Sequence, residues 1–127
     1  MTPEEIKAGN VIIAEFMGAK QSDYGDYMIF TKDNPRGSGK INHQEILYHQ
    51  SWDWLIPVIE KVGTQQYSED GDFIYLRTFG MKDPDGNYMV RFNRSFLHSD
   101  PSFIKAAYSA VLEVIEGIMR ENALVKN

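Results

Sequence analysis

The sequence predicts an α+β domain in which a small antiparallel sheet of about three strands is packed by three helices, in the manner of an α-β-α sandwich. Three observations predict this class: a capped helix start near each end of the chain, an apolar run with helical spacing at residues 51–62, and a hairpin centred on residues 73–94. The length of 127 residues and the 43% hydrophobic content suit a single domain over residues 1–127.

The first helix is predicted from Thr2-Pro3-Glu4-Glu5, in which Thr2 is the N-cap, Pro3 the first helical residue and Glu5 the partner in a capping box. Apolar residues recur on one side up to Met17, and Gly18 can end the helix. The pair Gly9-Asn10 is a point at which the helix could be interrupted.

A short strand is predicted at residues 27–31, which read YMIFT. Residues 32–44 are rich in Asn, Pro, Gly and Ser and are expected to form an exposed loop. A second short strand is a candidate at residues 45–48.

Residues 51–62 are predicted to form the second helix, with Ser51 as cap and Asp53 in the first turn. Helical spacing places Trp52 at the centre of the apolar side and Trp54 at its edge, while Pro57 falls on the polar side. Trp52 is therefore expected to anchor the core.

The hairpin is predicted from two alternating segments, 73–81 and 88–94, that flank the turn sequence DPDGN at 83–87. Alternation places Phe73, Tyr75 and Phe79 on one face and Ile74 and Leu76 on the other. Apolar residues are thus expected on both faces of the hairpin. Asp100-Pro101 then predicts the start of the longest helix, which continues to about residue 122, with Met119 on its apolar side.

Tyr48, His49, Asp53 and Trp54 are the candidate binding residues. Trp and Tyr are enriched where binding energy concentrates, so an exposed platform of Tyr48, His49 and Trp54 is one interpretation. The other is that these aromatics close one end of the core, and the common use of Trp in cores favours it.

A metal site formed by His43, His49 and Asp53 is a further hypothesis, since two imidazoles and a carboxylate suit a divalent ion. His49 and Asp53 share a helix face only if the helix extends back past Ser51, which the predicted cap opposes. Surface histidines are therefore favoured, and no cofactor is expected.

Composition and motifs restrict the function classes. The net charge of −5 provides no general attraction to phosphates, so nucleic-acid binding is not expected. The absence of cysteine excludes thiol nucleophiles and cysteine zinc sites. No nucleophile or phosphate-loop motif is complete, which favours a protein without enzymatic activity. No signal peptide or apolar span is evident, so a cytoplasmic protein without a membrane partner is expected.

Three segments, VIIAEFMG (11–18), YHQSWDWLIPVIEKV (48–62) and AAYSAVLEVIEGI (106–118), resemble a group of small uncharacterised bacterial and prophage-encoded proteins. These proteins carry "IAEFMG", "YHxSWDWLMPVVEKI" and "AVYxAVVEFI" helices around a small sheet. More distantly, the chain is similar to the phage α-β-α sandwich domain. It departs from the group in having Ile56 where Met is usual and a longer hairpin. The resemblance implies an origin on phage or other mobile DNA and supplies no catalytic residues.

Two hypotheses for function follow. The first is a non-enzymatic accessory or interaction protein that binds a protein partner or a second copy of itself, because apolar residues are expected on both hairpin faces. The alternative is a small-ligand or metal-binding domain that uses Tyr48, His49, Asp53 and Trp54.

Overall fold

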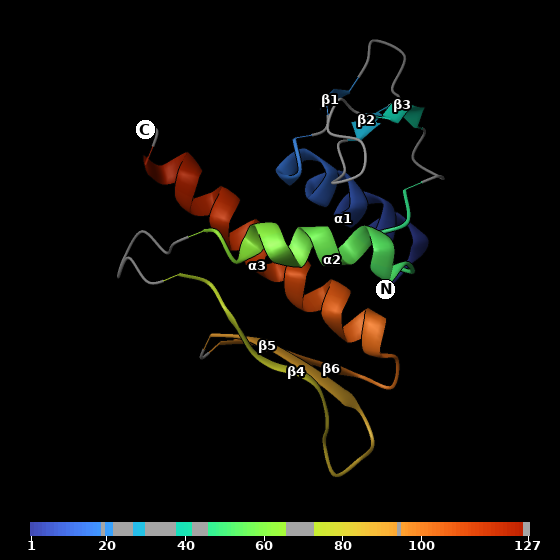
Figure 1. The fold of residues 1–127 in the computed structure, drawn as a ribbon, viewed down its shortest axis with the longest axis vertical. Coiled ribbons are helices and arrows are strands. Elements are labelled where there is room, and N and C mark those ends of the chain that lie inside the picture. The colour runs from blue at the N-terminus through green and yellow to red at the C-terminus, as the bar shows by residue number, and fades with distance from the viewer. Residues whose placement is uncertain are drawn as a thin grey trace. The chain divides into compact units, whose positions relative to one another are not determined.

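The computed structural model describes residues 1–18, 20–21, 27–29, 38–41, 46–65, 73–93 and 95–125. Over these residues the chain forms three helices and two three-stranded antiparallel sheets (Figure 1), which confirms the predicted α+β class. The chain divides into two compact units, Met1–Val58 and Ile59–Asn127, and the division falls inside the second helix. That residues 1–127 form a single domain stays a prediction.

The first unit begins with α1 (Pro3–Phe16), whose start is the predicted capping box. The Glu5 N–H donates to Thr2 Oγ1 at 3.2 Å, and the Thr2 N–H donates to Glu5 Oε1 at 3.5 Å. Gly18 follows the helix with a φ of +88°, a value that glycine adopts without strain. The interruption considered at Gly9-Asn10 does not occur, because both residues lie buried within α1.

Three short strands follow, β1 (Lys20–Gln21), β2 (Tyr27–Ile29) and β3 (Ser38–Ile41), and they pair in that order. The strand predicted at 27–31 is confirmed over 27–29, whereas β3 lies in a segment predicted to be loop. The strand considered at 45–48 is wrong over the described residues 46–48. The Leu47 carbonyl instead accepts hydrogen bonds from the N–H groups of Gln50 and Ser51, so the chain turns directly into the next helix.

The second helix, α2 (Trp52–Val62), begins one residue after Ser51, whose carbonyl accepts the first helical hydrogen bond from Leu55. Leu55, Val58 and Val62 are fully buried, whereas both tryptophans are only half-buried. At about 100° per residue the centre of this buried stripe lies roughly 80° from each tryptophan. The prediction of Trp52 at the centre of the apolar side is therefore wrong, because the two indoles flank the stripe.

The second unit contains the sheet of β4 (Leu76–Lys82), β5 (Tyr88–Phe92) and β6 (Ser95–Asp100), paired in that order. The predicted hairpin is confirmed as β4 and β5. Asp83 closes its turn by accepting hydrogen bonds from the N–H groups of Asp85 and Asn87 on Oδ1, and Gly86 has a φ of +86°. The strand β6 was not predicted.

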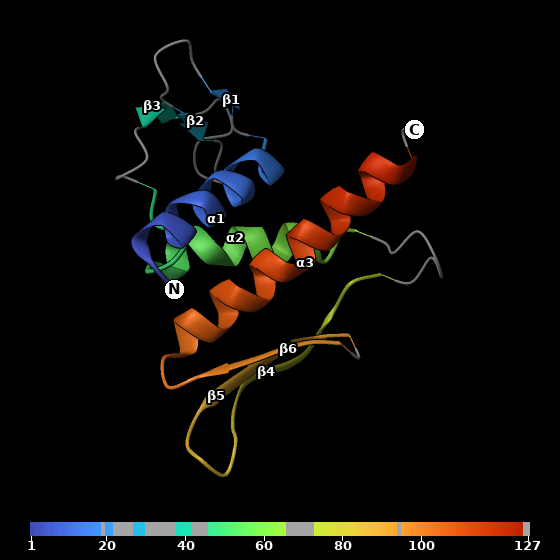
Figure 2. The ribbon, with the colours of Figure 1, turned by 180° about the vertical axis from the view of Figure 1, so that it is seen from behind.

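The last helix, α3 (Phe103–Val125), packs on β5 and β6 and runs along one face of the sheet in both ribbon views (Figures 1 and 2). The predicted start at Asp100 is wrong by two residues. Asp100 ends β6 and accepts the Ser102 N–H, while the Ser102 carbonyl accepts the first helical bond from Ala106. The buried side of α3 runs from Ala106 to Ile118, and Met119, which was predicted to lie on the apolar side of this helix, is exposed.

The face of the sheet that packs on α3 is identified by three side chains of β5. Val90 and Phe92 are buried, and the Tyr88 ring stacks on Phe103 of α3 with centroids 5.3 Å apart. Since side chains alternate along a strand, Met89 and Arg91 point to the opposite face. This opposite face is called the outer face below.

Two irregularities in β4 change the predicted alternation. The register pairs Leu76 with Phe92, Phe79 with Val90, and Met81 with Met89, with a shift after Leu76 and another after Phe79. Directly paired residues share a face. Phe79 therefore lies on the α3 side, where its ring meets that of Phe103 at 4.8 Å, and the prediction that it shares a face with Tyr75 is wrong.

Within the described part of the chain, no helix is both long enough and apolar enough to span a membrane.

Candidate functional site

The four predicted binding residues lie at the start of α2, but they do not form one open surface. Tyr48 is 2% exposed, and its ring meets the Trp54 ring edge to face, with centroids 5.2 Å apart and an interplanar angle of 87°. Burial raises the pKa of the Tyr48 phenol, which therefore stays neutral. The interpretation as an exposed platform is thus wrong for Tyr48, which forms part of the core beside a half-buried Trp54, as the interpretation favoured from the sequence has it.

His49 is tied to α1 through Asn10, a residue that the sequence did not suggest as part of the site. The Asn10 side chain is 3% exposed, and its Nδ2 donates to the Ile46 carbonyl at 3.3 Å and lies 3.0 Å from His49 Nδ1. Because a carbonyl can only accept, the Asn10 amide nitrogen must face Ile46, and His49 Nδ1 is then the acceptor of the second bond. The ring proton of neutral His49 therefore resides on Nε2.

Burial lowers the pKa of His49, in agreement with an imidazole that accepts at Nδ1 in its neutral form. Asn10 Oδ1 is buried and has no hydrogen-bond partner among the described residues. The arrangement fixes the turn at residues 46–49 against α1, which is a structural role.

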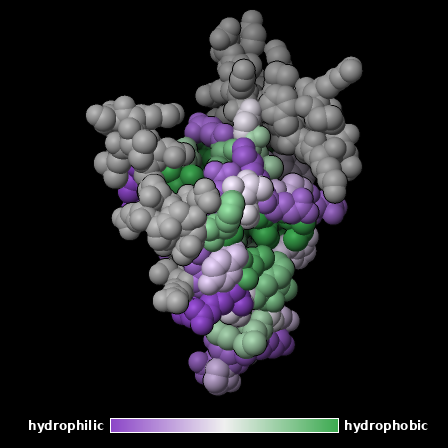
Figure 3. Space-filling view, turned by 60° about the vertical axis from the view of Figure 1, so that its left-hand side comes forward, coloured by the Kyte–Doolittle hydropathy of each residue, from purple (hydrophilic) through white to green (hydrophobic). Residues whose placement is uncertain are grey.

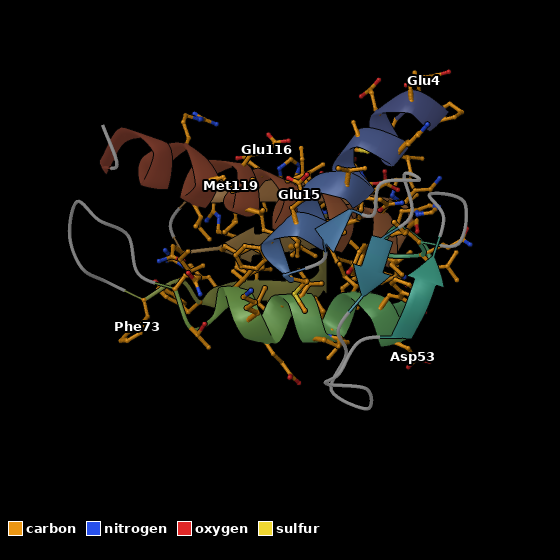
Figure 4. All side chains as sticks on the ribbon, turned by 90° about the horizontal axis from the view of Figure 1, so that it is seen from above. Glu4, Glu15, Asp53, Phe73, Glu116 and Met119 are labelled. Atoms are coloured by element: carbon orange, nitrogen blue, oxygen red, sulfur yellow. The ribbon has the colours of Figure 1, made fainter. Side chains whose placement is uncertain are left out.

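Asp53 lies apart from this cluster. It is exposed on the first turn of α2 and points outward from the helix (Figure 4). His43, the third candidate metal ligand, lies outside the described residues. Over the described ranges no group of three or more His, Cys, Asp or Glu side chains is placed to hold a metal ion.

The outer face of the second sheet carries four large apolar side chains that are exposed. Phe73 is 57% exposed, Tyr75 50%, Met81 66% and Leu97 47%. Met81 is placed there by its pairing with Met89, and Leu97 by its pairing with Arg91. Tyr75 and Phe73 continue the alternation from the inward-facing Leu76, with the buried Ile74 between them, and the Phe73 side chain points outward in Figure 4. Figure 3 shows hydrophobic residues at the surface at the height of this sheet, bordered by hydrophilic ones.

Asn93 holds the two aromatic residues in place. Its backbone N–H donates to the Tyr75 carbonyl at 2.9 Å, its Oδ1 accepts the Tyr75 N–H at 3.0 Å, and its Nδ2 donates to the Phe73 carbonyl at 3.3 Å. Asn93 has a φ of 54°, a left-handed conformation that Asn tolerates better than most residues. Three hydrogen bonds from one residue thus fix the backbone of the segment 73–75.

Arg91 is the basic residue that the register places on the outer face. It lies on the central strand, paired with Thr78 on one side and Leu97 on the other. Its Nε is buried and has no hydrogen-bond partner within the described part of the chain. A shielded guanidinium nitrogen that lacks an acceptor is costly, because desolvation is not offset by a hydrogen bond.

The alternating aromatic pattern at 73–75 was the sequence signal for this face. The sequence could not show that the face would stay uncovered, because that depends on where α3 packs. Comparison with protein-family models, with curated proteins and with solved structures found no match.

Proposed function

We propose that the protein is a non-enzymatic interaction protein that binds another polypeptide through the outer face of the β4–β5–β6 sheet. The observation that carries this proposal is the set of four exposed apolar side chains on one sheet face: Phe73, Tyr75, Met81 and Leu97. Half of an aromatic side chain represents roughly 100 Å² of apolar surface, and with a similar area for the exposed parts of Met81 and Leu97 the four side chains together expose about 400 Å². A patch of this size lies within the range of the largest patches on monomeric proteins, which are often functional.

The order of the segment around the patch also supports binding. Side chains on a backbone that is already fixed lose less conformational entropy when a partner covers them. Phe73 and Tyr75 are held in this way by Asn93. The origin on phage or other mobile DNA and the cytoplasmic location belong to the same proposal, and they are supported by the resemblance and by the sequence alone.

The alternative at Tyr48, His49, Asp53 and Trp54 stays a prediction. The burial of Tyr48 and the outward position of Asp53 give these residues no common surface on which a ligand would touch all four.

A site-specific crosslink tests the proposal without knowledge of the partner. A photoreactive benzoylphenylalanine replaces Tyr75 on the outer face or, as the matched control, Met119, an exposed apolar residue of α3. After irradiation in cells that express the protein, we expect a discrete crosslinked product from position 75 and none from position 119. A product from neither position, or the same products from both, would contradict a binding role of the outer face.

A further inference from the structure

We infer that the partner presents a carboxylate among apolar side chains, so that the outer face binds an acidic, apolar polypeptide segment with Arg91 as the residue that recognises its charge. This inference rests on the proposed function, since it names the chemistry of the partner at the same face.

The first argument is the charge of the sheet. The strands β4, β5 and β6 contain Arg77, Lys82 and Arg91 but only one carboxylate, that of Asp100. Asp100 is paired with Tyr88, on the face that packs on α3, and its Oδ1 already accepts the Ser102 N–H. The described strands therefore place no carboxylate on the outer face, although the whole chain has a net charge of −5. A complementary partner brings negative charge to this face.

The second argument is the state of Arg91. Its Nε is removed from water without an acceptor among the described residues, and it lies between the exposed Leu97 and the half-buried Thr78. Arg91 as a whole is partly exposed, so a carboxylate of the partner would accept two parallel N–H bonds from its terminal guanidinium nitrogens, and such charge-assisted pairs are stronger than neutral ones. The apolar neighbours would exclude water from this pair once a partner covers the face.

Two other occupants fit less well. A second copy that docked through the same face would bring a second Arg91 and no carboxylate to meet the first. A single-stranded nucleic acid could stack on Phe73 and Tyr75. A nucleic acid carries a phosphate at every nucleotide, so some phosphates would approach the exposed Asp85 and the partly exposed Asp83 in the turn that ends this face, and like charges there oppose binding. The inferred segment needs only one carboxylate, at Arg91 on the central strand, away from that turn.

A displayed library of short random peptides, selected on the full-length protein, tests the inference. We expect the enriched peptides to combine Asp or Glu with aromatic or aliphatic residues. Replacing their acidic residues by Asn or Gln should raise the Kd about tenfold or more, because losing a hydrogen bond to a charged group changes an affinity by about 10- to 100-fold. This change is made in the peptide and therefore leaves the fold of the protein untouched.

Variants of the protein complete the test. Arg91→Gln should weaken binding of the acidic peptides about as much as the loss of their carboxylates, and the two changes together should weaken it little further. Lys82→Gln is the matched control, because Lys82 lies over the Tyr88 ring on the α3 side, with Nζ 4.9 Å from the ring centroid. Thermal unfolding of both variants establishes that each is folded.

The inference would be overturned if the enriched peptides were neutral or basic, or if acidic peptides bound Arg91→Gln as tightly as the wild type. The proposed function would still hold in either case, provided that Tyr75→Ser abolishes peptide binding. Two further results would also overturn the inference. An oligouridine probe that binds the wild type but not Tyr75→Ser would identify a nucleic acid as the occupant of the outer face. A dimer in sedimentation that Tyr75→Ser dissociates would identify a second copy of the chain as the occupant. Peptide binding that survives Tyr75→Ser, or a library with no peptide that depends on Tyr75, would contradict the proposed function itself.

Discussion

The start of α2 and the outer face of the second sheet both carry aromatic residues, yet they use them in opposite ways. At α2, Tyr48 is buried against Trp54, and Asn10 joins the neighbouring His49 to the Ile46 carbonyl. On the sheet, Phe73 and Tyr75 are fixed through their backbone by Asn93, and their side chains remain in water. The comparison teaches that residue type alone does not mark a binding surface. The α2 segment is richer in Trp and His, but the exposed surface lies on the sheet.

The largest expected effect comes from removing one tyrosine of each region. Tyr48→Ala should lower the free energy of unfolding by about 3–5 kcal/mol, because it removes a buried aromatic ring and leaves a cavity. Tyr75→Ala, the matched control on the outer face, should change it by less than about 0.5 kcal/mol. Urea denaturation followed by circular dichroism measures both. Equal losses would mean that the two regions do not differ in burial.

The covered face of the same sheet offers a second contrast. Gly80 has a φ of +89°, and a Cβ built there would lie 2.7 Å from Phe103 Cζ, whereas Gly86 has a φ of +86° with no atom within 4 Å. Gly86→Ala should cost about 1–2 kcal/mol from backbone strain alone. Gly80→Ala adds a clash and should cost about 1–3 kcal/mol more. Chemical denaturation gives both values, and equal costs would show that Phe103 does not pack on Gly80.

Substitution of Asn93 tests whether this residue orders the backbone of residues 73–75 in the free protein. Asn93→Gly keeps the left-handed backbone and the bond to the Tyr75 carbonyl but removes two side-chain hydrogen bonds. We expect a loss of about 1 kcal/mol in stability. Amide hydrogen exchange of residues 73–75 should be faster in this variant and unchanged across α2. Unchanged exchange at Tyr75 would mean that Asn93 does not order the outer face.

The smallest expected effect is a pH dependence of the free energy of unfolding that arises from His49. It is small because His49 is partly exposed. The pKa of His49 is lowered from 6.5 by burial, so below that pH the unfolded chain binds more protons than the folded one. This contribution to stability is complete above pH 6.5 and is lost as the pH falls through that value. Thermal unfolding as a function of pH should therefore show a decline in wild type that is smaller in His49→Gln. His98→Gln in β6 serves as the control. This variant should keep the part of the decline in stability at low pH that His49 causes.

Much of the fold follows from local sequence signals. The capping box at Thr2 and Glu5, the helix at 52–62 and the DPDGN turn depend on residues close in sequence, and all three were predicted. The errors arise where contacts between residues distant in sequence determine the strand pairing or the face on which a side chain lies. The strand β6 has little alternation of its own and depends on pairing with β5. Phe79 changed face because the register with β5 shifts twice along β4.

The candidate site was predicted less well for the same reason. Tyr48, His49 and Trp54 were selected by residue type, but the turn that carries Tyr48 and His49 is held by Asn10 of α1, which lies 39 residues from His49 along the chain. Arg91 gave no sequence signal, because its place on the outer face follows from its strand register, and the shielding of its Nε follows from packing. The hairpin aromatics Phe73 and Tyr75 were predicted to share a face, and their exposure required knowledge of where α3 packs.

Hydroxyl-radical footprinting with mass spectrometry tests the central claim, that the outer face of the sheet is open and the aromatic cluster at α2 is closed. In the free protein we expect Phe73, Tyr75 and Met81 to be oxidised rapidly and Tyr48 to be protected until the protein is unfolded. Protection of Tyr75 and Met81 equal to that of Tyr48 in the free monomer would contradict the claim.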